Sequence, residues 1–366
     1  MSKTIAVIFG GVSNENEISV ITGTMAANVL KSGGDSVIPV YISQKGDIYA
    51  GEMLADVNFF KGENYKKAPR AIIANGGVYT LNKGGRVKKF KSVDVALNCC
   101  HGGFGEGGGV SGLCQIAGIP LASAGIFESA AFMDKYITKL VLSSLGVTTA
   151  PYAYIKSVEK LNCTLNMPDF PLIVKPVNLG SSIGVEMAQN AEELKNAVES
   201  ALYYDSAVIV EKYLKNRREI NCAAYFAEGK VITSECEEAF ASGDLLSFED
   251  KYEGGGKSKL PADIPPDMSE FIKKNTAEVY TKLNMRGIVR FDYIISDGKI
   301  YVSEINTVPG SLSYYLLSSG FKNFYPVLTA VINQAIEDFE KNKSKKLITT
   351  GILENIPQNS IKLGKK

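Results

Sequence analysis

Two polar pairs lie on neighbouring strands that we expect near residues 288–305. The first pair is Arg290 and Asp292, and the second is Glu304 and Asn306. Because side chains alternate across a strand, the two members of each pair share one face. Two carboxylates and an amide oxygen suit Mg²⁺ that bridges nucleotide phosphates, with Arg290 over the reacting group. The alternative is a hairpin face held by salt bridges, but both strands are otherwise apolar, which favours a site.

The turn between these strands decides whether the two pairs meet. A two-residue turn at Asp297 and Gly298 would pair Ser296 with Lys299, and would place Asp292 and Glu304 on opposite faces. A three-residue loop over residues 296–298 would instead bring all four polar side chains together. The metal-site hypothesis therefore requires that the carboxylates of Asp292 and Glu304 face each other.

A second candidate for phosphate binding follows an expected strand at residues 172–175. This strand ends in Lys175, and a loop of glycine and serine comes shortly after it, at residues 180–185. Backbone N–H groups of such a loop can surround phosphate oxygens while the lysine supplies a fixed positive charge. The alternative is a plain hairpin loop with a surface lysine.

Composition excludes several classes of function. The 366 residues contain 40 Lys and Arg against 39 Asp and Glu, so the basic excess typical of nucleic-acid binding is absent. His101 is the only histidine, which excludes sites built on two or more histidines and favours an oxygen-ligated metal. The six cysteines include no C-x-x-C pair and are expected in the core. With neither a signal peptide nor an apolar run long enough to span a membrane, we predict a cytoplasmic protein that binds neither nucleic acid nor membrane.

Hydrophobic patterning predicts how these residues are positioned. A strand at residues 4–9, a helix at 17–31 and a strand at 37–42 form a parallel α/β unit. A hairpin surrounds residues 82–85, and one helix is expected over residues 129–145. Shorter strands then alternate with two helices, a pattern typical of α+β structure. We place domains at residues 1–123, 124–211 and 212–340, followed by a basic tail at 341–366.

The order of the motifs resembles that of D-alanine–D-alanine ligases of the ATP-grasp superfamily, from about residue 4 to about residue 340. The shared segments are Gly10-Gly11-Val12-Ser13-x-Glu15-x-Glu17, His101-Gly102, Gly105-Glu106, Met133-Asp134-Lys135, Lys175-Pro176, Gly180-Ser181-Ser182-Ile183-Gly184, Lys251-Tyr252, Arg290-Phe-Asp292 and Glu304-Ile-Asn306-Thr-x-Pro309-Gly310. The resemblance implies an ATP-grasp fold with an N-terminal parallel α/β, Rossmann-like domain and two α+β lobes that clasp ATP. It also implies a homodimer.

The same resemblance implies a reaction. ATP phosphorylates the carboxylate of a first D-alanine, and the amine of a second amino acid attacks the acylphosphate, which yields a dipeptide for peptidoglycan synthesis. Residues implied for ATP are Lys135, Lys175, Gly180, Ser182 and Gly184 at the phosphates, Glu211, Lys212 and Leu214 at the adenine, and Glu219 at the ribose. Those implied for two Mg²⁺ ions, with Mn²⁺ as an alternative, are Asp292, Glu304 and Asn306.

Further residues acquire catalytic roles through the resemblance. Glu15 would fix the ammonium of the first D-alanine and would be linked to Ser181 and Tyr252. Arg290 and the N–H of Gly310 would stabilise the oxyanion. Lys251 would contact the transferred phosphoryl group, and His101 would lie near the second substrate.

Three features depart from the family pattern, the third of them a pair of tyrosines. Gly107 stands where aspartate is usual, and Asn16 where His or Arg is frequent. Tyr314 and Tyr315 stand where the family commonly has His-Ser, whose serine binds the carboxylate of the second substrate. The alternatives to a ligase that joins two D-alanines are therefore one with another acceptor, such as D-serine, or a nucleotide-binding scaffold without turnover.

Overall fold

The computed structural model describes residues 2–82, 84–163, 167–241, 243, 257–343, 345, 348 and 350–356. Lys251, Tyr252 and most of the expected basic tail lie outside these residues. The described chain forms three sheets, which follow one another in the sequence. No described helix is long and apolar enough to cross a membrane.

The first sheet has seven strands in the order β6-β5-β4-β3-β2-β1-β7. The predicted strand–helix–strand unit is confirmed: β1 (Thr4–Gly10) and β2 (Ser36–Ile42) are parallel and are connected through α1 (Asn16–Ser32). The predicted hairpin is also present, formed by β5 (Gly77–Leu81) and β6 (Val87–Ser92). The remaining strands are β3 (Ile48–Ala50), β4 (Arg70–Ala74) and β7 (Val95–Asn98), and short helical turns cover Glu52–Ala55 and Val57–Lys67.

The predicted helix over residues 129–145 is wrong as a single element. A turn at Gly105–Gly109 leads into α2 (Val110–Ala117), and two helices follow, α3 (Ile126–Met133) and α4 (Lys135–Ser144). Asp134 separates them with an extended backbone, and its Oδ1 accepts a hydrogen bond from the N–H of Ile137 at 2.8 Å. This is an N-cap, which satisfies a free donor at the start of α4. The break places Lys135 in the first turn of α4.

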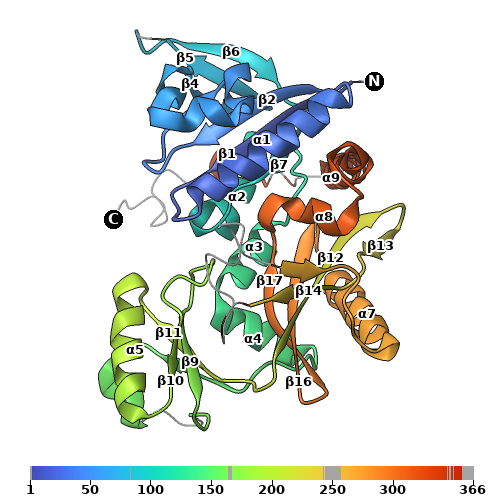
Figure 1. The fold of residues 1–366 in the computed structure, drawn as a ribbon. Helices are drawn as coiled ribbons and strands as arrows, with labels where there is room; N and C mark the ends of the chain where they lie inside the picture. Colours follow the sequence, from blue (N-terminus) through green and yellow to red (C-terminus); the bar gives the residue numbers. More distant parts are fainter. Residues whose placement is uncertain are drawn as a thin grey trace, which may run out of the picture.

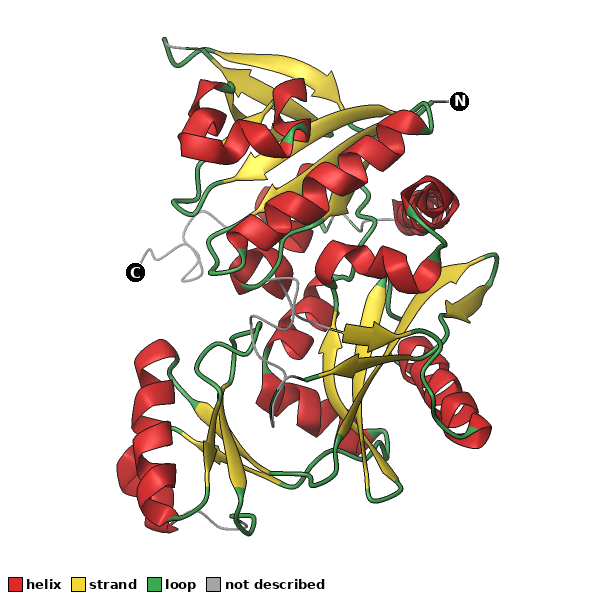
Figure 2. Ribbon diagram, viewed as in Figure 1, coloured by secondary structure: helices red, strands yellow, loops and turns green. Residues whose placement is uncertain are grey.

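The second sheet has the order β10-β9-β11-β8, and helix α5 packs on one of its faces (Figure 2). Its elements are β8 (Tyr152–Ile155), a helical turn at Val158–Cys163, β9 (Leu172–Pro176), β10 (Glu186–Ala188), α5 (Ala191–Tyr204) and β11 (Val208–Lys212). All neighbouring pairs are antiparallel, as the alternation of short strands predicted.

The third sheet has the order β15-β14-β12-β16-β17, with β13 paired to β12. Its strands are β12 (Arg218–Ala227), β13 (Lys230–Thr233), β14 (Glu237–Phe240), β15 (Lys257–Lys259), β16 (Val289–Ser296) and β17 (Lys299–Asn306). Helix α7 (Pro266–Lys282) buries Ile272, Val279 and Tyr280 in the core of this sheet. Turns at Gly310–Ser313 and Phe321–Phe324 enclose α8 (Tyr314–Leu317).

Helix α9 (Tyr325–Lys343) returns the chain to the first sheet, where it lies near α1 and β7 (Figure 1). Val327, Leu328, Val331 and Ile332 are buried in the same core as the inward residues of β1. The loop after β17 contributes Val308 and Leu312 to this core. The first and third sheets are therefore packed together, and a short α10 (Ile352–Asn355) follows.

Candidate active site

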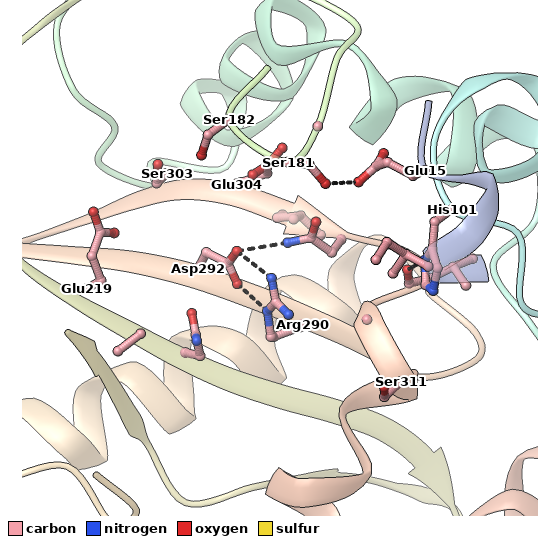
Figure 3. Close-up of a pocket in the computed structure, with 18 of the residues that line it drawn as sticks. Glu15, His101, Ser181, Ser182, Glu219, Arg290, Asp292, Ser303, Glu304 and Ser311 are labelled. Carbon is pink, nitrogen blue, oxygen red and sulfur yellow. Dashed lines mark hydrogen bonds and ion pairs between the residues drawn. The ribbon is translucent and has the colours of Figure 1, made fainter. Parts of the chain in front are cut away.

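A cleft of about 460 Å³ lies where loops and strands of the three sheets meet, within the size range of small-molecule sites. Polar side chains from all three sheets face one another there (Figure 3). The sequence-predicted residues that line it are Glu15, His101, Lys135, Lys175, Gly180, Ser181, Ser182, Glu219, Arg290, Asp292, Glu304, Asn306 and Gly310. Residues from positions 15 to 310 are thus brought to one place.

A β-bulge brings the carboxylates of Asp292 and Glu304 to one face. The turn is the two-residue alternative, because Ser296 pairs with Lys299. Regular pairing from that turn would have separated the carboxylates. The register instead shifts between Asp292 and Tyr293: Tyr293 pairs with Val302, Asp292 pairs with Glu304, and Ser303 is the extra residue. The expectation that convergence requires a three-residue loop is therefore wrong, since the bulge achieves the same result.

Hydrogen bonds connect three of the four polar residues of this hairpin, and the fourth, Glu304, pairs with Lys135. Arg290 donates from Nε and Nη2 to the two carboxylate oxygens of Asp292, at 2.6 and 2.9 Å. Asn306 donates from Nδ2 to Asp292 Oδ2 at 3.0 Å, and Lys135 Nζ lies 3.4 Å from Glu304 Oε1. These contacts fix the side chains that the sequence predicted for the metal.

The donor set fits a hard divalent cation that also binds substrate phosphates. The described residues contain no group of three or more His, Cys, Asp or Glu that could hold a metal on their own. Asp292, Glu304 and Asn306 supply two carboxylates and one amide oxygen on neighbouring strands. Mg²⁺ typically takes one or two carboxylates and completes its shell with phosphate oxygens and water.

Lys175 belongs to a buried ion cluster on the second sheet. Its Nζ lies 2.7 Å from Glu211 Oε2, and Nζ of Lys139 lies 2.8 Å from Glu211 Oε1. Burial alone would raise the pKa of Glu211, but the two lysines hold it well below the ordinary range. Glu211 is therefore a carboxylate that orients Lys175 at the wall of the cleft.

The loop after β9 reaches across the cleft to the first sheet. Ser181 donates a hydrogen bond to Glu15 Oε1, as the resemblance implied (Figure 3). A Cβ at Gly180 would lie 2.9 Å from Glu15 Oε2, so a side chain at this position would displace the Glu15 carboxylate. Lys135 Nζ donates to the carbonyl oxygen of Leu179 at 2.5 Å, which fixes the start of the loop. Backbone and hydroxyl groups of this loop thus border the space beside Lys135 and Lys175.

His101 is buried at the other end of the cleft, and both ring nitrogens are hydrogen-bonded. Nδ1 lies 2.8 Å from the carbonyl oxygen of Val308, and Nε2 lies 2.7 Å from Oγ1 of Thr22. Burial lowers the pKa of His101 to about 4, so the ring is neutral at pH 7. Nδ1 must carry the proton, because a carbonyl oxygen can only accept.

Several predicted contacts to the nucleotide are not on the cleft wall. Gly184, Glu211, Lys212 and Leu214 are not among the described residues that line it, and Lys251 and Tyr252 lie outside the described residues. Their roles stay predictions. Glu219 does line the cleft and pairs with Arg217.

The two tyrosines that depart from the family pattern point to different places. Tyr315 lines the cleft and forms a side-chain hydrogen bond with Arg290. Burial raises the pKa of Tyr315, so the phenol is neutral at pH 7. The ring of Tyr314 instead stacks on Phe321 with centroids 4.3 Å apart and packs against the first core. Only Tyr315 is therefore placed to contact a ligand.

The sequence predictions missed a polar row that begins just before β12 and continues on β12 and β14. Arg217, Asn221 and Glu237 line the cleft, and Asn221 Nδ2 donates to Glu237 Oε2 at 3.0 Å. The spacing of two residues between positions 217, 219 and 221 was a signal that these side chains share a face. Glu106, which appeared only within a motif, is also in the cleft, and burial raises its pKa to about 8.

Family models match most of the chain. The D-ala D-ala ligase N-terminus matches residues 4–124, and the D-ala D-ala ligase C-terminus matches residues 141–336. The chain belongs to the D-alanine–D-alanine ligase family. Curated family members named D-alanine–D-alanine ligase include one from Thermosipho melanesiensis, 35% identical over 99% of both chains. Another, from Thermoanaerobacter pseudethanolicus, is 33% identical over 92% of this chain and 97% of its own.

Solved structures of the D-alanine–D-alanine ligase family share this fold. The D-alanine–D-alanine ligase of Helicobacter pylori aligns with a TM-score of 0.76 at 27% identity, over 90% of this chain and 98% of its own. The D-Ala:D-Ser ligase VanG of Enterococcus faecalis aligns with a TM-score of 0.76 at 25% identity, over 92% of this chain and all of its own. The described chain therefore has the ATP-grasp architecture of these ligases.

Proposed function

We propose that this protein joins two D-alanines to D-alanyl-D-alanine at the expense of ATP, for peptidoglycan precursor synthesis. The observation that carries the proposal is the pairing of Asp292 with Glu304 beside Arg290, in a cleft that Glu15 and Ser181 close from the other side. This arrangement suits activation of a carboxylate by phosphoryl transfer. Membership of the D-alanine–D-alanine ligase family supports the substrate.

The chemistry follows from the poor reactivity of a carboxylate. Phosphorylation converts one carboxylate oxygen of the first D-alanine into a leaving group, and the amine of the second then displaces it. Lys135 and Lys175 hold the ATP phosphates, Glu15 binds the ammonium of the first D-alanine, and Arg290 with the N–H of Gly310 stabilises the oxyanion. Two Mg²⁺ or Mn²⁺ ions, held by Asp292, Glu304 and Asn306, would neutralise charge on the transferred phosphoryl group.

The remaining assignments rest on the resemblance. Ser182 and Gly184 contribute to the phosphate loop; Glu211, Lys212 and Leu214 contact the adenine, and Glu219 contacts the ribose. Lys251 and Tyr252 complete the site at the phosphoryl group and at Glu15, and His101 lies at the second substrate. A homodimer in the cytoplasm, with domains at residues 1–123, 124–211 and 212–340, is the form in which we expect the enzyme to act.

The test is ADP release with ATP, Mg²⁺ and D-alanine as the sole amino acid, with detection of the dipeptide. Saturable turnover supports the proposal. The variant Glu304→Gln keeps the side-chain shape but removes a carboxylate, so its turnover must collapse if the activity belongs to this site. Silence with D-alanine and with a panel of second amino acids would contradict a ligase and favour a nucleotide-binding scaffold.

One observation supports a second candidate, a ligase with an acceptor other than D-alanine. Tyr315 faces the cleft at a position where the family commonly has the serine that binds the acceptor carboxylate. Its phenol reaches Arg290, so a hydroxyl is present but lies farther from the backbone. The overall fold does not decide between acceptors, because the D-Ala:D-Ser ligase aligns with the same TM-score as the D-alanine–D-alanine ligase.

We expect Tyr315→Phe to raise the KM of the second amino acid by about tenfold or more. The reason is that the acceptor carboxylate, a charged group, would lose the hydrogen bond from the Tyr315 hydroxyl. The KM of ATP should not change. Tyr314→Phe is the matched control, since the ring of Tyr314 packs against Phe321 and Phe324 and does not line the cleft. Initial rates with D-alanine and D-serine as acceptors measure both effects. An unaltered acceptor KM in Tyr315→Phe would exclude this residue from the acceptor site.

A further inference from the structure

Three consecutive non-glycine residues in the loop after β17 have a left-handed backbone. Ser311, Leu312 and Ser313 have φ angles of 49°, 49° and 50°. L-amino acids adopt this conformation at an energetic cost, and a run of three persists only when the surroundings impose it. The run directly follows Gly310 and precedes Tyr315, both of which line the cleft.

Two buried side chains from the first sheet region hold the start of this loop on both sides of Gly310. Thr22, on α1, accepts a hydrogen bond at Oγ1 from the N–H of Ser311, at 3.0 Å. The same Oγ1 lies 2.7 Å from Nε2 of His101, whose Nδ1 bonds the carbonyl oxygen of Val308. The loop is thus held at position 308 and at position 311 by one connected pair.

The direction of each hydrogen bond between Val308, His101, Thr22 and Ser311 is determined by the two backbone groups at the ends of the series. The carbonyl oxygen of Val308 can only accept, so Nδ1 of His101 donates and Nε2 of the neutral ring accepts. The hydroxyl proton of Thr22 must therefore point to His101, which leaves a lone pair for the N–H of Ser311. No member can be removed without leaving a buried polar group unsatisfied.

Other contacts also anchor the loop. Leu312 is buried in the first core, and its N–H bonds the carbonyl oxygen of Pro309 at 2.8 Å. The hydrogen bond to Pro309 holds the peptide group that contains the Gly310 N–H, and the burial of Leu312 holds the far side of the turn. Among the described residues, the Thr22–His101 pair binds the two peptide groups that flank the Pro309–Gly310 peptide.

We propose that Thr22 is a positioning residue for catalysis: through Ser311 and His101 it fixes the peptide N–H of Gly310 toward the cleft. Thr22 is fully buried and does not itself line the cleft, so it acts only through the loop. The inference rests on the proposed function, in which the N–H of Gly310 stabilises the oxyanion. A donor displaced by about 1 Å costs about a hundredfold in rate.

The test compares Thr22→Val, which keeps the shape but removes the hydroxyl, with Thr22→Ser, which keeps the hydroxyl. We expect kcat to fall about tenfold to a hundredfold in Thr22→Val, with the KM of ATP unchanged, and to be restored in Thr22→Ser. Thr24→Val is the matched control, because Thr24 is also buried on α1 but its hydroxyl bonds the carbonyl oxygens of Val20 and Ile21 of the same helix. If Thr22→Val does not fold, Thr22→Ala takes its place.

A second readout separates this inference from the proposed function. Hydrogen–deuterium exchange of the peptide that contains Ser311 should be faster in Thr22→Val than in wild type, and unaltered in Thr24→Val. This measurement requires no turnover, so it holds even if the wild-type protein joins no amino acids. The proposal is overturned if Thr22→Val has the kcat of Thr24→Val, or if exchange at residue 311 does not change.

Discussion

Replacement of Arg290 with lysine should lower kcat by about 100- to 1,000-fold, the usual effect of losing an oxyanion donor. The guanidinium binds both oxygens of Asp292, at 2.6 and 2.9 Å, and also bonds Tyr315. A lysine ammonium keeps the charge but cannot reproduce this fork. Among the described residues, the hydrogen bond from Asn306 at 3.0 Å would still orient the Asp292 carboxylate.

Steady-state ADP release at saturating D-alanine measures this effect, and thermal unfolding shows whether the variant is folded. Arg286→Lys is the control, because Arg286 also pairs with an aspartate, Asp338, but does not line the cleft. We expect its kcat to be that of wild type. A wild-type kcat in Arg290→Lys would remove Arg290 from the proposed chemistry.

The hairpin shows what the sequence could and could not predict. Alternation along each strand correctly placed Arg290 with Asp292 and Glu304 with Asn306. The sequence did not determine the pairing register of the two strands, which depends on the turn. The observed two-residue turn alone would have placed the carboxylates on opposite faces. The bulge at Ser303 reverses this, and it depends on how the sheet twists in the folded protein. The alternation of side chains along each strand does not reveal that one residue, Ser303, is inserted.

The other features that the sequence could not predict depend on packing between distant segments. Most short strands of the second sheet were predicted to within two residues, because their apolar runs are local features. The break at Asp134 was missed since residues 129–145 read as one periodic segment, although Asp is a common N-cap. The placement of α9 against the first core, the pairing of Lys139 with Glu211, and the hold of Thr22 on Ser311 all join distant segments.

The second large effect concerns stability. We expect Glu211→Gln to lower the free energy of unfolding by about 3–5 kcal/mol, because Lys139 and Lys175 lose the carboxylate that compensates their charges. Only 2% of the Lys139 side chain is exposed, so water cannot replace the carboxylate there. Urea unfolding measures the change. Glu199→Gln is the control, since Glu199 pairs with Lys195 on the exposed surface of α5 and should contribute little.

A double variant tests the cause of this loss. Lys139→Met in the Glu211→Gln background removes the uncompensated buried charge, so the double variant should be more stable than Glu211→Gln alone. Equal stability of the two would contradict the ion-pair explanation. The remaining cation, Lys175, has 14% of its side chain exposed at the cleft and can be hydrated there.

Acid should remove this contribution, and the sign follows from the pKa of Glu211. The folded protein keeps the carboxylate ionised because the lysines hold its pKa well below the ordinary glutamate value of 4.5. The unfolded chain takes up a proton near 4.5, so the unfolded state binds more protons and stability falls as the pH drops below that value. The gap between wild type and Glu211→Gln should therefore be widest near pH 7 and narrow below pH 4.5. A gap that stays constant through this range would mean that Glu211 stabilises the fold by its shape and hydrogen bonds, and not by its charge.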